Sequence, residues 1–247
     1  MRIMVLNPNT SHGMTASIGR AAQAVAGPTT EILAVQPEFG PVSIEGFYDE
    51  AIAAAGVAAR VRASDAQDIQ GLALACFGDP GLDAAREALA CPVLGIAEAA
   101  FHAAAMVSSG FSIVTTMTRT CVIAEHLVVK YGFERQCRGI HGTDVPVLAL
   151  EDAGDALQEQ LFAASREALN KDGSDAIVLG CAGMAPLCEA LQQRLGVPVI
   201  DGVAAAVKLL EALQGLGLKT SKRCNYARPL EKTYLGWAAP LGWPPKT

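Results

Sequence analysis

Short apolar runs alternate along the chain with longer stretches in which apolar residues recur at helical spacing. In the first half this pattern predicts strands at residues 3–6, 31–35, 72–75 and 93–96, and helices at about 9–27 and 48–63. In the second half it predicts strands at 112–115, 138–141, 176–179 and 199–200, and helices at about 119–131, 155–170 and 202–216. Short apolar strands that alternate with helices predict an α/β fold with parallel sheets and right-handed crossovers.

Landmarks of the first half recur in the second half in the same order. Cys76, in Leu-Ala-Cys-Phe-Gly, and Cys181, in Leu-Gly-Cys-Ala-Gly, lie 105 residues apart, and the Pro-Val pairs at 92 and 198 lie 106 apart. Order and nearly constant spacing together predict a duplicated βα unit. We therefore expect two pseudo-symmetric Rossmann-like lobes, formed by residues 1–97 plus about 207–247 and by residues 98–206. The active site is expected in the cleft between the lobes.

The composition of the chain limits the classes of partner that it is expected to bind. The chain has 247 residues, of which 51% are hydrophobic, and a net charge of −6 with 19 basic residues. No apolar run approaches the roughly 18 residues that span a bilayer, so we expect a cytoplasmic protein that does not bind membranes. The acidic balance argues against nucleic acid and leaves a small-molecule substrate as the expected ligand. We expect a homo-oligomer, with the Pro- and Trp-containing tail packed on the surface or on a neighbouring subunit.

Seven cysteines without a CxxC pair predict neither a disulfide framework nor a structural zinc site. Four of them are expected to be small buried apolar residues, namely Cys91, Cys121, Cys137 and Cys188. The repeat separates Cys76 and Cys181 from this group, because it places one thiol at the end of a strand in each lobe. Such a pair suits chemistry on both faces of one carbon. No phosphate loop, dinucleotide fingerprint or metal-ligand cluster is found, so neither a cofactor nor a metal is expected.

Several segments resemble one known family. They are Asn7-Pro8-Asn9-Thr10-Ser11, Ser43-Ile44-Glu45-Gly46, residues 75–82 and 95–99, Ser112-Ile113-Val114-Thr115-Thr116, and residues 178–184 and 198–203. Together they look like the hydantoin racemase branch of the aspartate/glutamate racemase superfamily, over residues 1 to about 220. Within that branch, residues 76–81, 146–152 and 217–222 are similar to allantoin racemases.

The resemblance implies a racemase, free of metal and cofactor, whose Cys76 and Cys181 flank the substrate. The C5 hydrogen of a hydantoin lies next to a ring carbonyl, so racemisation needs a base on one face and an acid on the other. One cysteine must then be thiolate while its partner stays a thiol. We expect a helix N-terminus to lower a cysteine pKa, and backbone N–H groups after each cysteine to stabilise the developing oxyanion. Gly78 and Gly183 would let this backbone approach the ring closely.

The remaining candidate residues have weaker support. Asn9 and Thr10 contact ligand or simply cap a helix, and the same two interpretations apply to the mirrored loop with Thr115, Thr116 and Thr118. Pocket walls are suggested by the resemblance alone, and the candidates are Ser43, Phe77 and Ala182. Glu98 and Asp201 follow matched strands, where we expect a structural cap or a hydrogen bond between lobes.

Three alternatives remain open, and the last two use the same two cysteines differently. The substrate of a racemase could be another 5-substituted hydantoin. A maleate isomerase or arylmalonate decarboxylase would use one cysteine as nucleophile or proton donor, and a missing second thiol would favour the decarboxylase. A non-enzymatic two-lobed binding module would merely bury both thiols.

Overall fold

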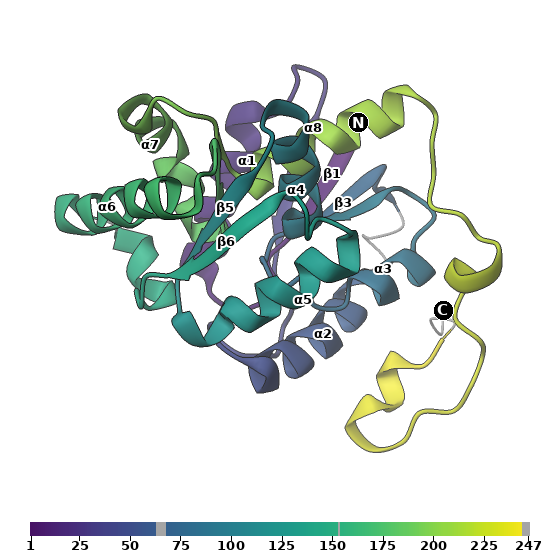
Figure 1. Cartoon of the computed structure of the whole chain (residues 1–247). Coiled ribbons are helices and arrows are strands. Elements are labelled where there is room, and N and C mark those ends of the chain that lie inside the picture. The colour runs from purple at the N-terminus through teal and green to yellow at the C-terminus, as the bar shows by residue number, and fades with distance from the viewer. Residues whose placement is uncertain (63–67, 153, 244–247) are drawn as a thin grey trace.

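The computed structural model describes residues 1–62, 68–152 and 154–243 (Figure 1). The first half forms a parallel sheet in the order β2-β1-β3-β4. Its strands are β1 (Arg2–Leu6), β2 (Glu31–Val35), β3 (Gly71–Leu74) and β4 (Val93–Gly95). The central strands β1 and β3 are almost wholly apolar and buried, as expected for strands that are covered on both faces.

The second half forms a separate parallel sheet in the order β6-β5-β7-β8. Its strands are β5 (Phe111–Thr115), β6 (Cys137–Gly142), β7 (Ala176–Leu179) and β8 (Val199–Ile200). The two sheets therefore share one strand order, and the first strand of each half pairs with the second and third strands. This confirms the predicted α/β fold with two similar lobes.

Helices cover the faces of both sheets (Figure 1). They are α1 (His12–Val25), α2 (Phe47–Arg62), α3 (Leu82–Ala88), α4 (Ile96–Val107), α5 (Cys121–Tyr131), α6 (Asp155–Asp172), α7 (Cys188–Leu195) and α8 (Gly202–Gly215). The sequence pattern did not delimit α3, α4 and α7. Two of these are short, and α4 follows β4 without an intervening loop. None of the described helices is long and apolar enough to cross a membrane.

Two helices pack on the lobe opposite to the strand that precedes them. The helix α4 follows β4 of the first sheet, yet Ala100, Phe101 and Ala104 are buried in one cluster with Phe111 and Ile113 of β5. Conversely, α8 follows β8 of the second sheet but is buried against β1, β3 and α1. Each lobe thus receives its last helix from the other half of the chain. The lobe boundaries near residues 97 and 207 remain a prediction.

The tail runs along the first lobe on the side of α3 and α2 (Figure 1). The Tyr226 hydroxyl donates to Asp83 Oδ1 at 3.0 Å, and Arg62 Nε donates to the Gly242 carbonyl at 2.7 Å. The Trp237 ring meets Phe39 edge-on at 5.9 Å between centroids, although the indole stays 70% exposed. The tail therefore packs on the surface, and a contact with a neighbouring subunit stays a prediction.

Candidate active site

Cys76 and Cys181 occupy equivalent positions in the two lobes. Each lies two residues beyond the last residue of a central strand, Leu74 of β3 and Leu179 of β7. The carboxyl ends of parallel strands are where α/β folds present reactive groups. Both cysteines line one cavity of about 60 Å³. That volume has room for several water molecules.

The cavity is largely apolar, with polar groups at a few points. Its polar side chains, apart from the two cysteines, are Asn7, Asn9, Glu50, Thr115, Thr116 and Thr120. Apolar side chains from both lobes complete it, among them Met14, Ile18, Ile44, Phe77, Ile123 and Val147. Small-molecule sites commonly have this composition, in which apolar walls give binding and a few polar groups give orientation.

In each lobe, the backbone N–H two residues after the cysteine lowers the pKa of that thiol. This N–H belongs to Gly78 for Cys76 and to Gly183 for Cys181, so the repeat extends to this effect. Such a donor favours the thiolate form. Stabilisation of a substrate oxyanion by the backbone N–H groups after each cysteine stays a prediction.

Burial nevertheless has the largest effect on the pKa of both thiols. It raises the pKa of Cys181 to about 11, against the lowering effect of the Gly183 N–H, and nearby Glu45 adds to the rise. The pKa of Cys76 is raised more strongly, again by burial first and then by the charges of Cys181, Asp79 and Glu50. The expected lowering of a cysteine pKa by a helix N-terminus is therefore wrong for the ligand-free protein. The helix α3 begins only at Leu82, six residues after Cys76, and Cys181 precedes a short 3-10 helix, Ala182–Leu187.

We expect the alkylation of Cys181 by iodoacetamide to accelerate about tenfold per pH unit between pH 7 and pH 10. The reason is that the reactive thiolate is a minor species throughout the range below a pKa of about 11. Cys76 should react more slowly than Cys181 at every pH, because its pKa is raised further. Peptide mass spectrometry of timed samples resolves the two rates. A rate for Cys181 that is already constant above pH 8 would contradict the assignment of a neutral resting thiol.

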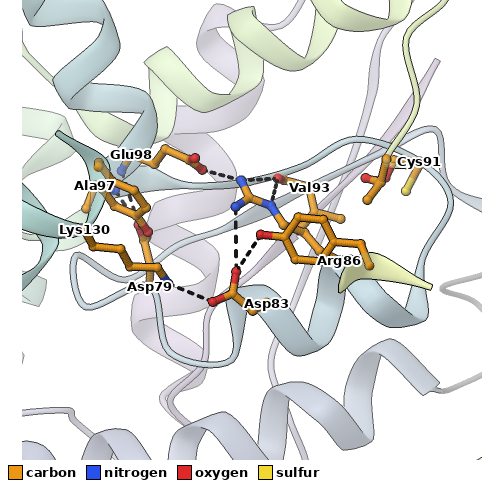
Figure 2. A network of polar contacts seen from close by, with 11 residues as sticks. Asp79, Asp83, Arg86, Cys91, Val93, Ala97, Glu98 and Lys130 are labelled. Carbon is orange, nitrogen blue, oxygen red and sulfur yellow. Dashed lines mark hydrogen bonds and ion pairs between the residues drawn. The ribbon is translucent and has the colours of Figure 1, made fainter. Parts of the chain in front are cut away.

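The loop after Cys76 is held in place by Asp79 (Figure 2). Its backbone N–H donates to the Cys76 carbonyl at 3.0 Å, and its backbone adopts a φ of 46°. The buried carboxylate accepts the Ala97 and Glu98 N–H groups, at 3.3 and 3.2 Å, and the Tyr131 hydroxyl at 2.8 Å. Because burial outweighs these donors, the pKa of Asp79 is raised to about 7. Asp79 thus ties the Cys76 loop to α4 and α5.

A second set of contacts braces the same region (Figure 2). Arg86 of α3 forms an ion pair with Glu98 and donates from Nε to the Val93 carbonyl at 3.1 Å. Asp201, which follows the matched strand of the other lobe, caps α8 by accepting the Val203 and Ala204 N–H groups. The expectation of a structural cap at Asp201 is confirmed, and Glu98 has an ion-pair role.

Asn9 is placed at the cavity by a small network in the first loop. Its Oδ1 accepts from Asn7 Nδ2 at 2.7 Å and from the Ser11 N–H at 2.9 Å. The cap of α1 is Ser11, whose Oγ accepts the Met14 N–H, so capping does not explain Asn9. In the described part of the chain no acceptor faces Asn9 Nδ2, although the residue is only 5% exposed. This amide is therefore free to donate to a ligand.

The other predicted residues divide into two groups. Residues that line the cavity are Phe77, Gly78, Thr115, Thr116, Ala182 and Gly183. Thr115 Oγ1 donates to the Gly180 carbonyl at 2.9 Å, which joins the two strand ends. Ser43 and Thr118 lie outside the lining, where Ile44 and Thr120 face the cavity instead. The Thr118 N–H donates to Asp144 at 2.9 Å, as part of the turn after β5.

Sequence reasoning missed Asn7 and Glu50. Asn7 belongs to a quoted motif, but its full burial depends on contacts with Asn9 and Thr15. Glu50 lies in the first turn of α2, where an acidic residue is ordinary. No three His, Cys, Asp or Glu side chains are grouped to hold a metal within residues 1–62, 68–152 and 154–243.

Comparison with known proteins places the chain in a family. The model of the Asp/Glu/Hydantoin racemase family matches residues 3–210. A hydantoin racemase of Rhizobium meliloti is 46% identical over 236 residues, which cover 96% of this chain and 98% of that protein. These matches, with the two-lobed fold, define an isomerase of the racemase class. The chain belongs to the Asp/Glu/hydantoin racemase family, which confirms the resemblance and shows an enzyme where a binding module was an alternative.

Two solved structures are similar over nearly their whole length. The allantoin racemase from Klebsiella pneumoniae is 55% identical, with a TM-score of 0.95, and the match covers 98% of this chain and 99% of that chain. The allantoin racemase from Pseudomonas fluorescens is 40% identical, with a TM-score of 0.92 and coverage of 96% and 100%.

Proposed function

We propose that this enzyme racemises allantoin by proton transfer at C5 between Cys76 and Cys181, without a metal or an organic cofactor. The observation that carries the proposal is that one thiol from each lobe lines the same cavity. The match to two proteins named allantoin racemase supports the choice of substrate. A second thiol in the cavity also favours racemisation over an arylmalonate decarboxylase reaction, which needs one proton donor.

The reaction is a proton exchange across the substrate ring. A thiolate on one face removes the C5 proton, and the electron pair moves into the neighbouring ring carbonyl to give an enolate. The thiol on the opposite face then returns a proton to C5, with inversion, and is left as thiolate. The two sulfurs exchange their protonation states, so the enzyme that has turned over one enantiomer is ready for the other.

The electrostatics of the cavity make Cys181 the thiol that ionises more readily in the ligand-free enzyme, and so favour it as the first base. Its pKa of about 11 lies below that of Cys76, which is surrounded by more acidic neighbours. Asn9 Nδ2 is a candidate donor to the enolate oxygen, since no acceptor among the described residues engages it. Donors already in position at a developing charge are worth several kcal/mol in a water-poor site, about 3–4 kcal/mol in measured cases.

A racemase of other 5-substituted hydantoins is the second candidate function. It is favoured by the relative from Rhizobium meliloti, which is named hydantoin racemase. The cysteine chemistry is the same in both cases, because the hydrogen at C5 lies next to the same ring carbonyl. Only the contacts with the C5 substituent differ.

Loss of optical rotation by enantiopure allantoin tests the proposal. We expect purified enzyme to abolish the rotation much faster than buffer alone, at the same pH and temperature. In deuterium oxide the product should carry deuterium at C5, because the donating thiol exchanges with solvent. A rotation that decays at the buffer rate, with enzyme shown to be folded, would reject allantoin as the substrate.

A further inference from the structure

Glu50 brings a carboxylate to the cavity. It lies in the first turn of α2, and its backbone N–H donates to the Gly46 carbonyl at 3.0 Å. Its side chain lines the cavity together with Cys76 and Gly78. Glu50 Oε1 lies 2.9 Å from the point that a Cβ on Gly78 would occupy, so the carboxylate packs directly against the loop after Cys76.

Other carboxylates near this site have donors, whereas Glu50 has none among residues 1–62, 68–152 and 154–243. Glu45 Oε1 accepts the Val147 N–H at 3.1 Å, and Asp49 Oδ2 accepts the Glu45 N–H at 3.0 Å. In the described ranges, no hydrogen-bond donor or ion-pair cation contacts the Glu50 carboxylate. Burial raises its pKa, and only the more distant charge of exposed His126 opposes this rise. A half-buried acceptor of this kind gains most from a ligand that supplies an N–H group.

The surroundings of Glu50 indicate which part of a substrate it meets. Ile44, Ile123 and Ala124 line the same cavity and cannot hydrogen-bond a ligand through their side chains. A ring whose C5 lies between the two thiols places its C5 substituent against the cavity wall. A ureido substituent carries N–H donors, whereas an alkyl or aryl substituent carries none.

We infer that Glu50 is a specificity-determining residue that accepts hydrogen bonds from the N–H groups of the C5 substituent of the substrate. This inference rests on the proposed racemase function and assigns the preference for a ureido group to one side chain. Substrates without an N–H on that substituent leave the Glu50 carboxylate desolvated and unpaired. The discrimination therefore comes from the penalty on the wrong substrate as well as from the contact with the right one.

The test compares two substrates in two Glu50 variants. We expect Glu50→Leu to lower kcat/KM for allantoin at least about thirtyfold, the loss typical of one hydrogen bond to a charged group. For 5-isopropylhydantoin the same variant should change kcat/KM by less than about threefold, or increase it, because a half-buried charge that this substrate leaves unpaired is removed. Glu50→Gln should lie between wild type and Glu50→Leu for allantoin, since it keeps an acceptor oxygen without the charge. Glu125→Leu, on the exposed face of α5, is the matched control and should leave both substrates unchanged.

The outcomes separate this inference from the proposed function. An equal loss on both substrates in Glu50→Leu would overturn the role of Glu50 and leave allantoin racemisation intact. Failure of the wild type to racemise allantoin would overturn the function itself. Calorimetry in the Cys76→Ser/Cys181→Ser background gives a second readout, independent of catalysis. There, Glu50→Gln should weaken allantoin binding and leave 5-isopropylhydantoin binding unchanged, and unchanged binding of both would also overturn the inference.

Discussion

Cys76→Ser and Cys181→Ser should each lower the rate of allantoin racemisation at least about a thousandfold, within the usual range for loss of a general acid or base. A serine hydroxyl is far harder to deprotonate than a thiol, so it cannot act as the base on its own face. Both thiols are already difficult to ionise, because burial raises the pKa of each. The rate is measured by polarimetry, starting from each enantiomer in turn. A single variant that keeps near wild-type turnover would remove the two-base mechanism.

Exchange with solvent should survive where racemisation does not. In Cys76→Ser the remaining Cys181 thiolate can still take and return a proton on its own face, so deuterium should enter one enantiomer without inversion. In Cys181→Ser, deuterium should enter the other enantiomer without inversion. Cys188→Ser is the matched control, because this thiol donates to the Val199 carbonyl at 3.2 Å and does not line the cavity. Its activity should stay close to that of the wild type.

Allantoin should exceed 5-benzylhydantoin in kcat/KM by at least about a hundredfold. The physical reason is that Glu50, which we assign to the C5 substituent, would be left unpaired by a benzyl group. Sites built to hydrogen-bond a substrate reject an analogue that lacks the partner group much more strongly than apolar pockets distinguish by size. Initial rates by polarimetry with both enantiopure substrates, over a range of concentrations, give the ratio.

An equal or reversed preference would assign the enzyme to other 5-substituted hydantoins. The roles of Cys76 and Cys181 would be unaffected, since they act at C5 in either case. A hydantoin with a small apolar substituent, such as 5-isopropylhydantoin, controls for size. If its kcat/KM is as low as that of the benzyl compound, the polarity of the C5 substituent and not its volume causes the discrimination.

The sequence is sufficient to predict the parts of the molecule that repeat. Strands such as β1 and β7 are short and apolar enough to be recognised directly, and the matched settings of Cys76 and Cys181 are enough to identify the thiol pair. The repeat does not show how deeply these thiols are buried. For that reason the predicted direction of their pKa shifts, which depends on packing from both lobes, is wrong.

Glu50 illustrates what a sequence pattern leaves open. At the start of a helix a glutamate is favourable for reasons of the helix dipole alone, and its local sequence is the same whether it faces water or a cavity. Its position depends on how the loop after β3 folds back against α2. Ser43 and Thr118 show the reverse situation, since both lie in segments near the cavity but outside its lining.

The crossing of α4 and α8 bears on how such a chain could have arisen by duplication. A half-length ancestor with the fold of residues 1–107 would carry a last helix whose apolar face, including Ala100 and Phe101, has no sheet of its own to cover. If two copies exchanged these helices, each helix would cover the sheet of the other copy, as α4 and α8 cover the opposite lobes in the present chain. Fusion of the two copies into one chain would then have made this exchange of helices permanent, and each half already needed the exchange to bury its last helix.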